Sequence, residues 1–305
     1  MLPLHAGPGD QIEPFTPLRL LTAWTFEPVL LAVIIALGSL YLYGVHKLRA
    51  RGDHWSRGRT FSFIGLGLGS AVVATQSAIG TYDTVLLSVH MAQHMILSML
   101  TPLAMALGAP VTLALRTLPA TPRSWLLSVL HSRFAKVICF PLIGFTLFVL
   151  SPWALYFSGW YDATLHSALL HDLLHLHFIL VGSLFFWPLL GLDPVPGRVI
   201  YPFRLMLVFL TLPFHAFLGI TIMSSTKLIA EDWYTSFGRS WPPSPLRDQY
   251  IAGGLLWGSG DLVGLLFFGV LFVQWVRQSQ REARREDRRL DRLEEQARRA
   301  ARPPR

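Results

Sequence analysis

Residues 28–51 have the sequence PVLLAVIIALGSLYLYGVHKLRAR, an uncharged apolar run that ends in a cluster of basic residues. An apolar run of about 20 residues is long enough to cross the hydrocarbon layer of a bilayer as a helix. Similar runs recur along the 305-residue chain. Because lipid offers no hydrogen-bond partner to the backbone, each run is expected to be helical. We therefore predict an all-α, polytopic membrane helical bundle.

The composition supports a surface that faces lipid. Charged residues make up only 14% of the chain and hydrophobic residues 52%, whereas a soluble domain carries roughly 25% charged residues. The formal net charge of +8 lies in short loops and a tail beside the apolar runs, which indicates membrane topology rather than nucleic-acid binding. A single cysteine, Cys139, excludes an intramolecular disulfide and a thiolate metal cluster.

The apolar runs predict about seven transmembrane helices and three regions. The predicted spans are residues 28–45, 61–79, 84–107, 134–157, 165–190, 203–223 and 251–276. Residues 1–27 form the predicted extracytoplasmic segment, residues 28–276 the transmembrane domain and residues 277–305 a basic cytoplasmic tail. The first span is expected to act as a signal anchor, because four prolines interrupt the residues before it.

The distribution of basic residues predicts the orientation. With these spans, 22 of the 26 Lys and Arg residues fall on one side of the membrane and four on the other. Short cytoplasmic loops carry an excess of Lys and Arg. The basic side is therefore predicted to be cytoplasmic, which places the amino terminus outside and the carboxyl terminus inside. Residues 113–130, which mix apolar residues with Arg and Pro, are expected to lie at the cytoplasmic interface.

Four histidines on two predicted spans are expected to share one depth in the membrane. His90 and His94 lie roughly 9 and 15 Å below the outer surface, counted from residue 84. His171 and His175 lie at the same two depths, counted from residue 165. Each pair is spaced i, i+4, so both rings of a pair occupy one helix face. Ionisable residues inside a membrane indicate a functional site.

Three further polar residues fall in or beside this layer. His215 and Asp261 lie roughly 13 and 14 Å deep on two other spans. Asp172 precedes His175 by three residues and is expected to orient its ring.

The layer predicts a site for a first-row metal, with copper ahead of zinc. Imidazole suits Cu, Zn, Fe and Ni, and thioether sulfur selects Cu(I) among them. Met91 and Met95 flank the histidines of the third span and are candidate auxiliary ligands. A structural interpretation stays open beside this one: intramembrane histidines also tie helices together by hydrogen bonds, and buried methionines commonly fill gaps in a core.

Four stretches of the chain resemble a known family. They are HMAQHMILSMLTPLAMALGAPVTLALR from His90, HDLLHLHFILVGSLFFWPLLGLDP from His171, PFHAFLGI from Pro213 and DQYIAGGLLWGSGDL from Asp248. In this order they resemble the CtaG family of cytochrome c oxidase assembly proteins, the multi-span type associated with Gram-positive terminal oxidases.

The resemblance implies an assembly factor in a bacterial plasma (inner) membrane. Its expected role is to handle copper for a haem–copper oxidase, with oxidase subunits or a copper chaperone as partners. The ligand role then carries over to His90, His94, His171, His175 and His215. No catalytic constellation is evident, so we expect no enzyme activity. Two alternatives stay open: a b-type haem protein that transfers electrons, with His94 and His175 as axial ligands, and a transporter of copper or protons.

Overall fold

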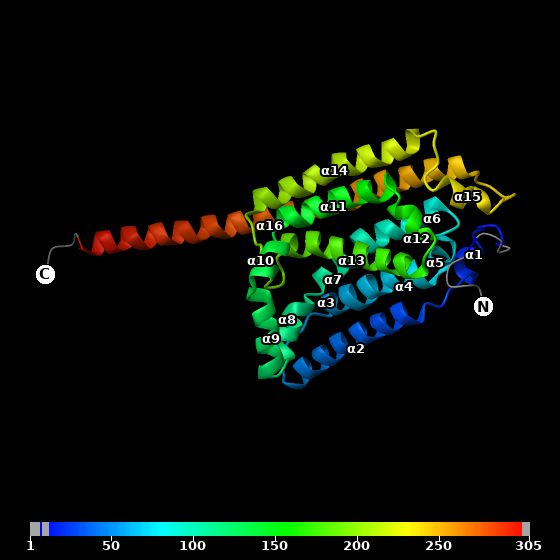
Figure 1. Ribbon diagram of the computed structural model, residues 1–305. Helices are drawn as coiled ribbons and strands as arrows, with labels where there is room; N and C mark the ends of the chain where they lie inside the picture. Colours follow the sequence, from blue (N-terminus) through cyan, green and yellow to red (C-terminus); the bar gives the residue numbers. More distant parts are fainter. Residues whose placement is uncertain (1–6, 8–11, 301–305) are drawn as a thin grey trace.

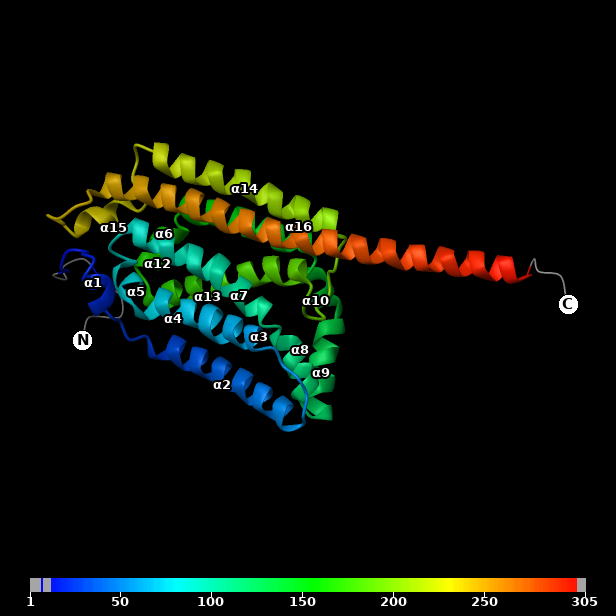
Figure 2. The same ribbon diagram turned by 180° about the vertical axis from the view of Figure 1, so that it is seen from behind.

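The computed structural model describes residue 7 and residues 12–300, and every regular element within these residues is a helix. Helices make up 79% of the described residues. The all-α prediction is therefore confirmed. The long helices run side by side and form one bundle (Figure 1; Figure 2).

Within the described residues, six helical segments are long and apolar enough to cross a membrane. They are α2 (Pro28–Ala50), Arg57–Tyr82, Leu87–Thr117, α13 (Ala168–Leu190), α14 (Tyr201–Ser224) and the apolar part of α16 (Pro245–Ala300). Each of the six coincides with one predicted span. The chain is thus a membrane protein by the length and composition of its helices.

The remaining predicted span, residues 134–157, is divided in the structure. It consists of α10 (Arg133–Ile138) and α11 (Pro141–Tyr156). The 16 residues of α11 extend roughly 24 Å, which is less than the thickness of a typical hydrocarbon layer. The loop before α14 packs into the break, since a Cβ on Gly197 would lie 2.1 Å from the carbonyl oxygen of Cys139. The number of crossings and the sidedness of the termini stay predictions.

Two of the long segments are composite. Arg57–Tyr82 comprises α3 (Arg57–Phe61), η1 (Ser62–Leu68), α4 (Gly69–Gln76) and α5 (Ala78–Tyr82). Leu87–Thr117 comprises α6 (Leu87–Met95), η2 (Ile96–Leu100), α7 (Thr101–Leu107) and α8 (Pro110–Thr117). The η stretches are π-helical, and such stretches are frequent at functional sites.

A close crossing of α7 and α13 lies beside η2. Pro102 has no N–H to donate to the carbonyl of Ser98, so this carbonyl projects from the helix. Gly182 of α13 meets it: an added Cβ would lie 2.0 Å from the Ser98 oxygen and 2.6 Å from Cγ of Pro102. Only a residue without a side chain permits this approach of the two backbones.

The connections between the long helices gather at the two ends of the bundle. Figure 1 shows α1 (Arg19–Thr22), α12 (Trp160–Leu165) and α15 (Glu231–Ser236) at one end. The helix α9 (Ala120–His131) lies at the other end, from which α16 extends beyond the bundle. The predicted tail, residues 277–305, is continuous with the last span as far as residue 300, because α16 has no break at residue 276.

Two buried carboxylates hold helix starts from across the bundle. Asp248 of α16 accepts hydrogen bonds from the backbone N–H of Leu87, at 2.7 Å, and from the hydroxyl of Ser88. Asp193 accepts from the backbone N–H and hydroxyl of Thr112, at 2.7 and 2.6 Å, and from the indole of Trp187 at 2.9 Å. Each carboxylate satisfies donors that a helix start leaves unpaired.

Candidate metal centre

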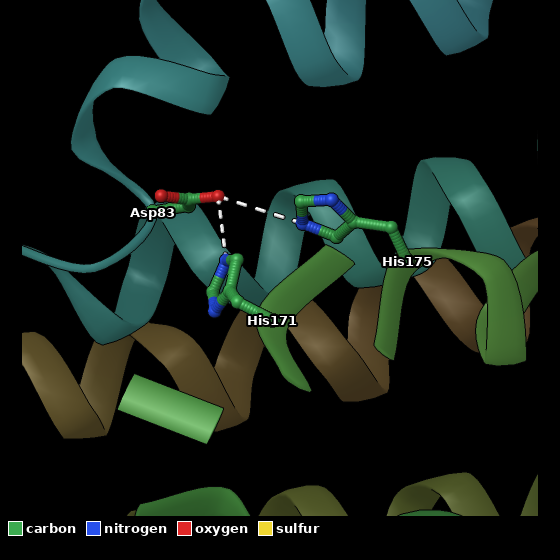
Figure 3. Close-up of side chains that lie close together, drawn as sticks. All are labelled: Asp83, His171 and His175. Atoms are coloured by element: carbon green, nitrogen blue, oxygen red, sulfur yellow. Dashed lines mark hydrogen bonds and ion pairs between the residues drawn. The ribbon is translucent and has the colours of Figure 1, made fainter. Parts of the chain in front are cut away.

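Asp83, His171 and His175 meet inside the bundle, and we call these three residues the Asp83 site. The Nε2 atoms of His171 and His175 lie 3.0 and 3.6 Å from Oδ2 of Asp83. Figure 3 shows both rings directed at the same carboxylate oxygen. All three side chains are fully buried, and one potential ligand atom from each lies within 4.8 Å of the others.

Local structure explains how the three residues converge. The hydroxyl of Ser167 accepts a hydrogen bond from the N–H of Leu170 at 3.4 Å and caps the start of α13. His171 and His175 then occupy one face of the first turns of this helix. Asp83 follows α5 directly, in the short connection to α6. That connection lies at the same end of the bundle as the start of α13 (Figure 1).

Gln93 of α6 joins two members of the site. Its amide Nε2 donates to Oδ2 of Asp83 at 2.8 Å and to the carbonyl of Ala74 at 3.0 Å. Its Oε1 lies 3.0 Å from Nε2 of His175. An amide oxygen only accepts hydrogen bonds, so His175 carries a proton on Nε2 in this arrangement. Gln93 therefore fixes the orientation of both the carboxylate and the imidazole.

The site combines the donor types of a cation-binding centre. Burial by itself would raise the pKa of the Asp83 carboxyl, but the two imidazoles beside it hold this pKa well below its usual range. The Oδ1 atom of Asp83 is buried and has no hydrogen-bond partner among the described residues. A cation at this place would take the positions of the protons that the imidazoles now direct at the carboxylate.

The histidine pair of α6 lies beside the Asp83 site but contacts a tyrosine. Nε2 of His90 and Nδ1 of His94 lie 3.2 and 2.8 Å from the hydroxyl of Tyr156. The His94 ring stacks on Phe178 with a centroid distance of 4.0 Å. The His90 and His171 rings are 6.1 Å apart. The structure thus brings the four predicted histidines into one buried layer, with the carboxylate paired to the α13 histidines alone.

The other predicted site residues have local partners. Nδ1 of His215 lies 3.0 Å from the carbonyl oxygen of Thr211 on its own helix. Asp261 accepts a hydrogen bond of 2.8 Å from the indole of Trp257, also on its own helix. The two auxiliary methionines belong to the main apolar core of the bundle, Met91 with 0% and Met95 with 6% of its surface exposed.

Glu27, Asp172 and His175 form a second cluster, which we call the Glu27 group. One potential ligand atom from each lies within 4.8 Å of the others. Glu27 directly precedes α2, and its backbone N–H donates to Oε1 of Gln76 at 3.0 Å. Burial, together with the nearby carboxylates of Asp83 and Asp172, raises the pKa of Glu27 to about 8. His175 belongs to both the Glu27 group and the Asp83 site.

Three residues of these clusters were not predicted from the sequence: Asp83, Gln93 and Glu27. Gln93 could have been found, because it follows His90 by three residues and so shares its helix face. Asp83 and Glu27 carried a weaker signal, which was a carboxylate at the end of an apolar run. The ends of spans ordinarily carry polar residues, so only the tertiary packing distinguishes these two.

The fold and the buried site together define a class: a polytopic helical membrane protein with an enclosed imidazole–carboxylate centre near one end of its bundle. The model of the cytochrome c oxidase caa3 assembly factor family (Caa3_CtaG) matches residues 39–278. The chain belongs to this family, and the resemblance of the four sequence stretches is confirmed.

Three mycobacterial relatives align with most of the chain. Uncharacterised proteins of Mycobacterium bovis and Mycobacterium tuberculosis are each 38% identical over 276 residues, which cover 88% of this chain and 42% of the relative. An uncharacterised protein of Mycobacterium leprae is 37% identical over the same extent. The chain therefore spans less than half the length of these relatives. No solved structure matches the chain.

Proposed function

We propose that this protein is a non-catalytic assembly factor of the bacterial plasma membrane that binds copper at the Asp83 site and delivers it to a haem–copper cytochrome c oxidase. Membership of the assembly factor family supports the oxidase as the process served. The binding step is carried by one observation: two imidazole nitrogens and a carboxylate oxygen converge within 4.8 Å in a fully buried place.

The donor set favours Cu(II) as the bound ion. Nitrogen and oxygen donors in a tetragonal arrangement suit Cu(II), whereas Cu(I) is selected by thiolate and thioether sulfur. The Asp83 site supplies His171, His175 and a carboxylate, and the nearby methionines pack in the apolar core instead. Copper is thus the cargo of the protein, and an oxidase subunit or a copper chaperone is its exchange partner.

The haem alternative has weaker support. A haem with His94 and His175 as axial ligands needs the two rings on opposite faces of a flat macrocycle. The His94 ring instead stacks on Phe178 at 4.0 Å, and His175 contacts Gln93 and Asp83. A large side-chain rearrangement would have to precede haem binding.

Metal analysis of the purified protein tests the proposal. The full chain in detergent is loaded with Cu(II), and separately with Cu(I) under anaerobic reducing conditions, and its affinity is measured against a chelator. We expect His171→Ala with His175→Ala to weaken copper binding by more than about 100-fold. We expect His90→Ala with His94→Ala, a matched pair on the neighbouring helix, to weaken it by less than about tenfold.

The delivery step needs a cellular measurement. A strain that lacks the gene is complemented with each variant, and the copper content and activity of its terminal oxidase are measured. We expect the oxidase to lose its copper in the strain that carries His171→Ala with His175→Ala. We expect it to keep its copper in the strain that carries His90→Ala with His94→Ala. Wild-type protein that binds no copper in either oxidation state would contradict the proposal and leave the Asp83 site as a hydrogen-bonded tie between helices.

A further inference from the structure

The Glu27 group differs from the Asp83 site in its access to the surface. All three members of the Asp83 site are buried, whereas Asp172 in the Glu27 group is only half-buried. His175 is common to both. An ion that reaches the enclosed site from the Asp172 side therefore meets the Glu27 group on its way.

Glu27 lacks the partners that a buried carboxyl normally has. Its side chain is 2% exposed, and neither Oε1 nor Oε2 has a hydrogen-bond partner among the described residues. No Lys or Arg of the described chain forms an ion pair with it either. Burial of a carboxyl without hydrogen-bond partners is unfavourable. Coordination of a cation is one of the ways in which such a group is stabilised.

The two clusters also contain more carboxyl groups than imidazoles. Asp83 lies beside His171 and His175, and the carboxyl groups of Glu27 and Asp172 lie beside His175. Buried carboxylates are stable only when they are paired or bound to a cation. The two clusters together thus have more acidic donors than one ion in the Asp83 site requires.

We propose that Glu27, Asp172 and His175 form an access subsite, which captures a divalent copper ion from the outer end of the bundle and passes it to the Asp83 site through the shared His175. This inference rests on the proposed function of the Asp83 site. The ion exchanges ligands without a change of oxidation state: bonds to Glu27 and Asp172 break as bonds to Asp83 and His171 form.

Rates of copper loading distinguish an access subsite from a resident one. The full chain in detergent is mixed rapidly with Cu(II) held by a chromogenic chelator, and the rate of transfer and the equilibrium affinity are both recorded. The variants are Glu27→Gln with Asp172→Asn, and Asp172→Asn alone. Asp162→Asn is the matched control, because this outer-end carboxylate pairs with His166 at 3.7 Å and belongs to neither cluster. Circular dichroism and gel filtration verify the fold of each variant.

The double variant is expected to load at least about tenfold more slowly, since acidic clefts raise the on-rates of cations by such factors. The equilibrium affinity of the double variant should stay within roughly threefold of wild type. The loading rate of Asp172→Asn alone should lie between the rates of the wild type and the double variant. Loading at the wild-type rate would overturn the access subsite while copper binding by the wild type still upholds the Asp83 site. A loss of equilibrium affinity of about tenfold or more would also overturn it, because the two carboxylates would then be ligands of the resident ion.

Discussion

Nε2 of His171 lies 3.0 Å from Oδ2 of Asp83, although the two residues are 88 positions apart in the sequence. The contact joins the connection between α5 and α6 to the first turns of α13. Both side chains are essentially excluded from solvent, at 1% and 0% exposure. A charged or strongly polar pair at such a place is rare unless it has a function.

Replacement of the Asp83 carboxylate by an amide should separate the effect of its charge on copper binding from the effect of its shape. Asp83→Asn keeps the size of the side chain and removes its negative charge, so the Asp83 site loses its anionic ligand. We expect copper affinity to fall by about 10- to 100-fold, measured by chelator competition on the purified protein. An unchanged affinity would show that Asp83 only positions the imidazoles through hydrogen bonds.

The tyrosine between the α6 histidines offers a test of their role. Tyr156→Phe removes the hydroxyl that lies 3.2 Å from His90 and 2.8 Å from His94. Two buried imidazole nitrogens then lose a partner, so the free energy of unfolding should fall by about 1–3 kcal/mol. Thermal unfolding in detergent, followed by circular dichroism, measures the change.

Copper affinity of the same variant should stay within about threefold of wild type, because the tyrosine is not part of the Asp83 site. A much larger loss of affinity in Tyr156→Phe would place the His90 and His94 rings in the copper coordination shell.

The crossing of α7 and α13 predicts a strict requirement for glycine. In Gly182→Ala the new Cβ would lie 2.0 Å from the carbonyl oxygen of Ser98, so the two helices must separate. We expect a loss of about 1–3 kcal/mol in the free energy of unfolding, as for other overpacked cores. Gly258→Ala on α16 is the matched control, because no atom lies within 4 Å of its Cβ position; it should be neutral or stabilising by up to about 1 kcal/mol. Equal unfolding temperatures for the two variants would contradict the close crossing.

Asp193, which caps the start of α8 at the opposite end of the bundle, supplies a purely structural comparison for Asp83. Asp193→Ala leaves the two donors of Thr112 and the indole of Trp187 without their acceptor. We expect the free energy of unfolding to fall by about 2–4 kcal/mol, from lost charge-assisted hydrogen bonds and a lost helix cap. Copper affinity of the folded fraction should not change. A parallel loss of copper binding would show that the two ends of the bundle are coupled.

Much of the architecture followed from local sequence alone. The run from residue 28 and its counterparts predicted helices of membrane-spanning length, because hydropathy and the i, i+4 spacing of His90 and His94 are properties of one helix at a time. The shared depth of the four histidines also followed, since depth is a count along a helix from a span end. The family resemblance rested on the same short stretches.

Partners across the bundle could not be derived in this way. Whether His171 faces Asp83, Tyr156 or lipid depends on the rotation of each helix about its axis, which packing against neighbours sets. The break before Pro141, the approach of Gly182 to Ser98 and the carboxyl of Glu27 beside His175 are likewise properties of contacts between helices. The sequence by itself determined which helices form and which polar side chains they carry to one level. Tertiary structure alone decided which of those side chains meet, because contacts between residues distant in the chain are settled by how whole helices pack.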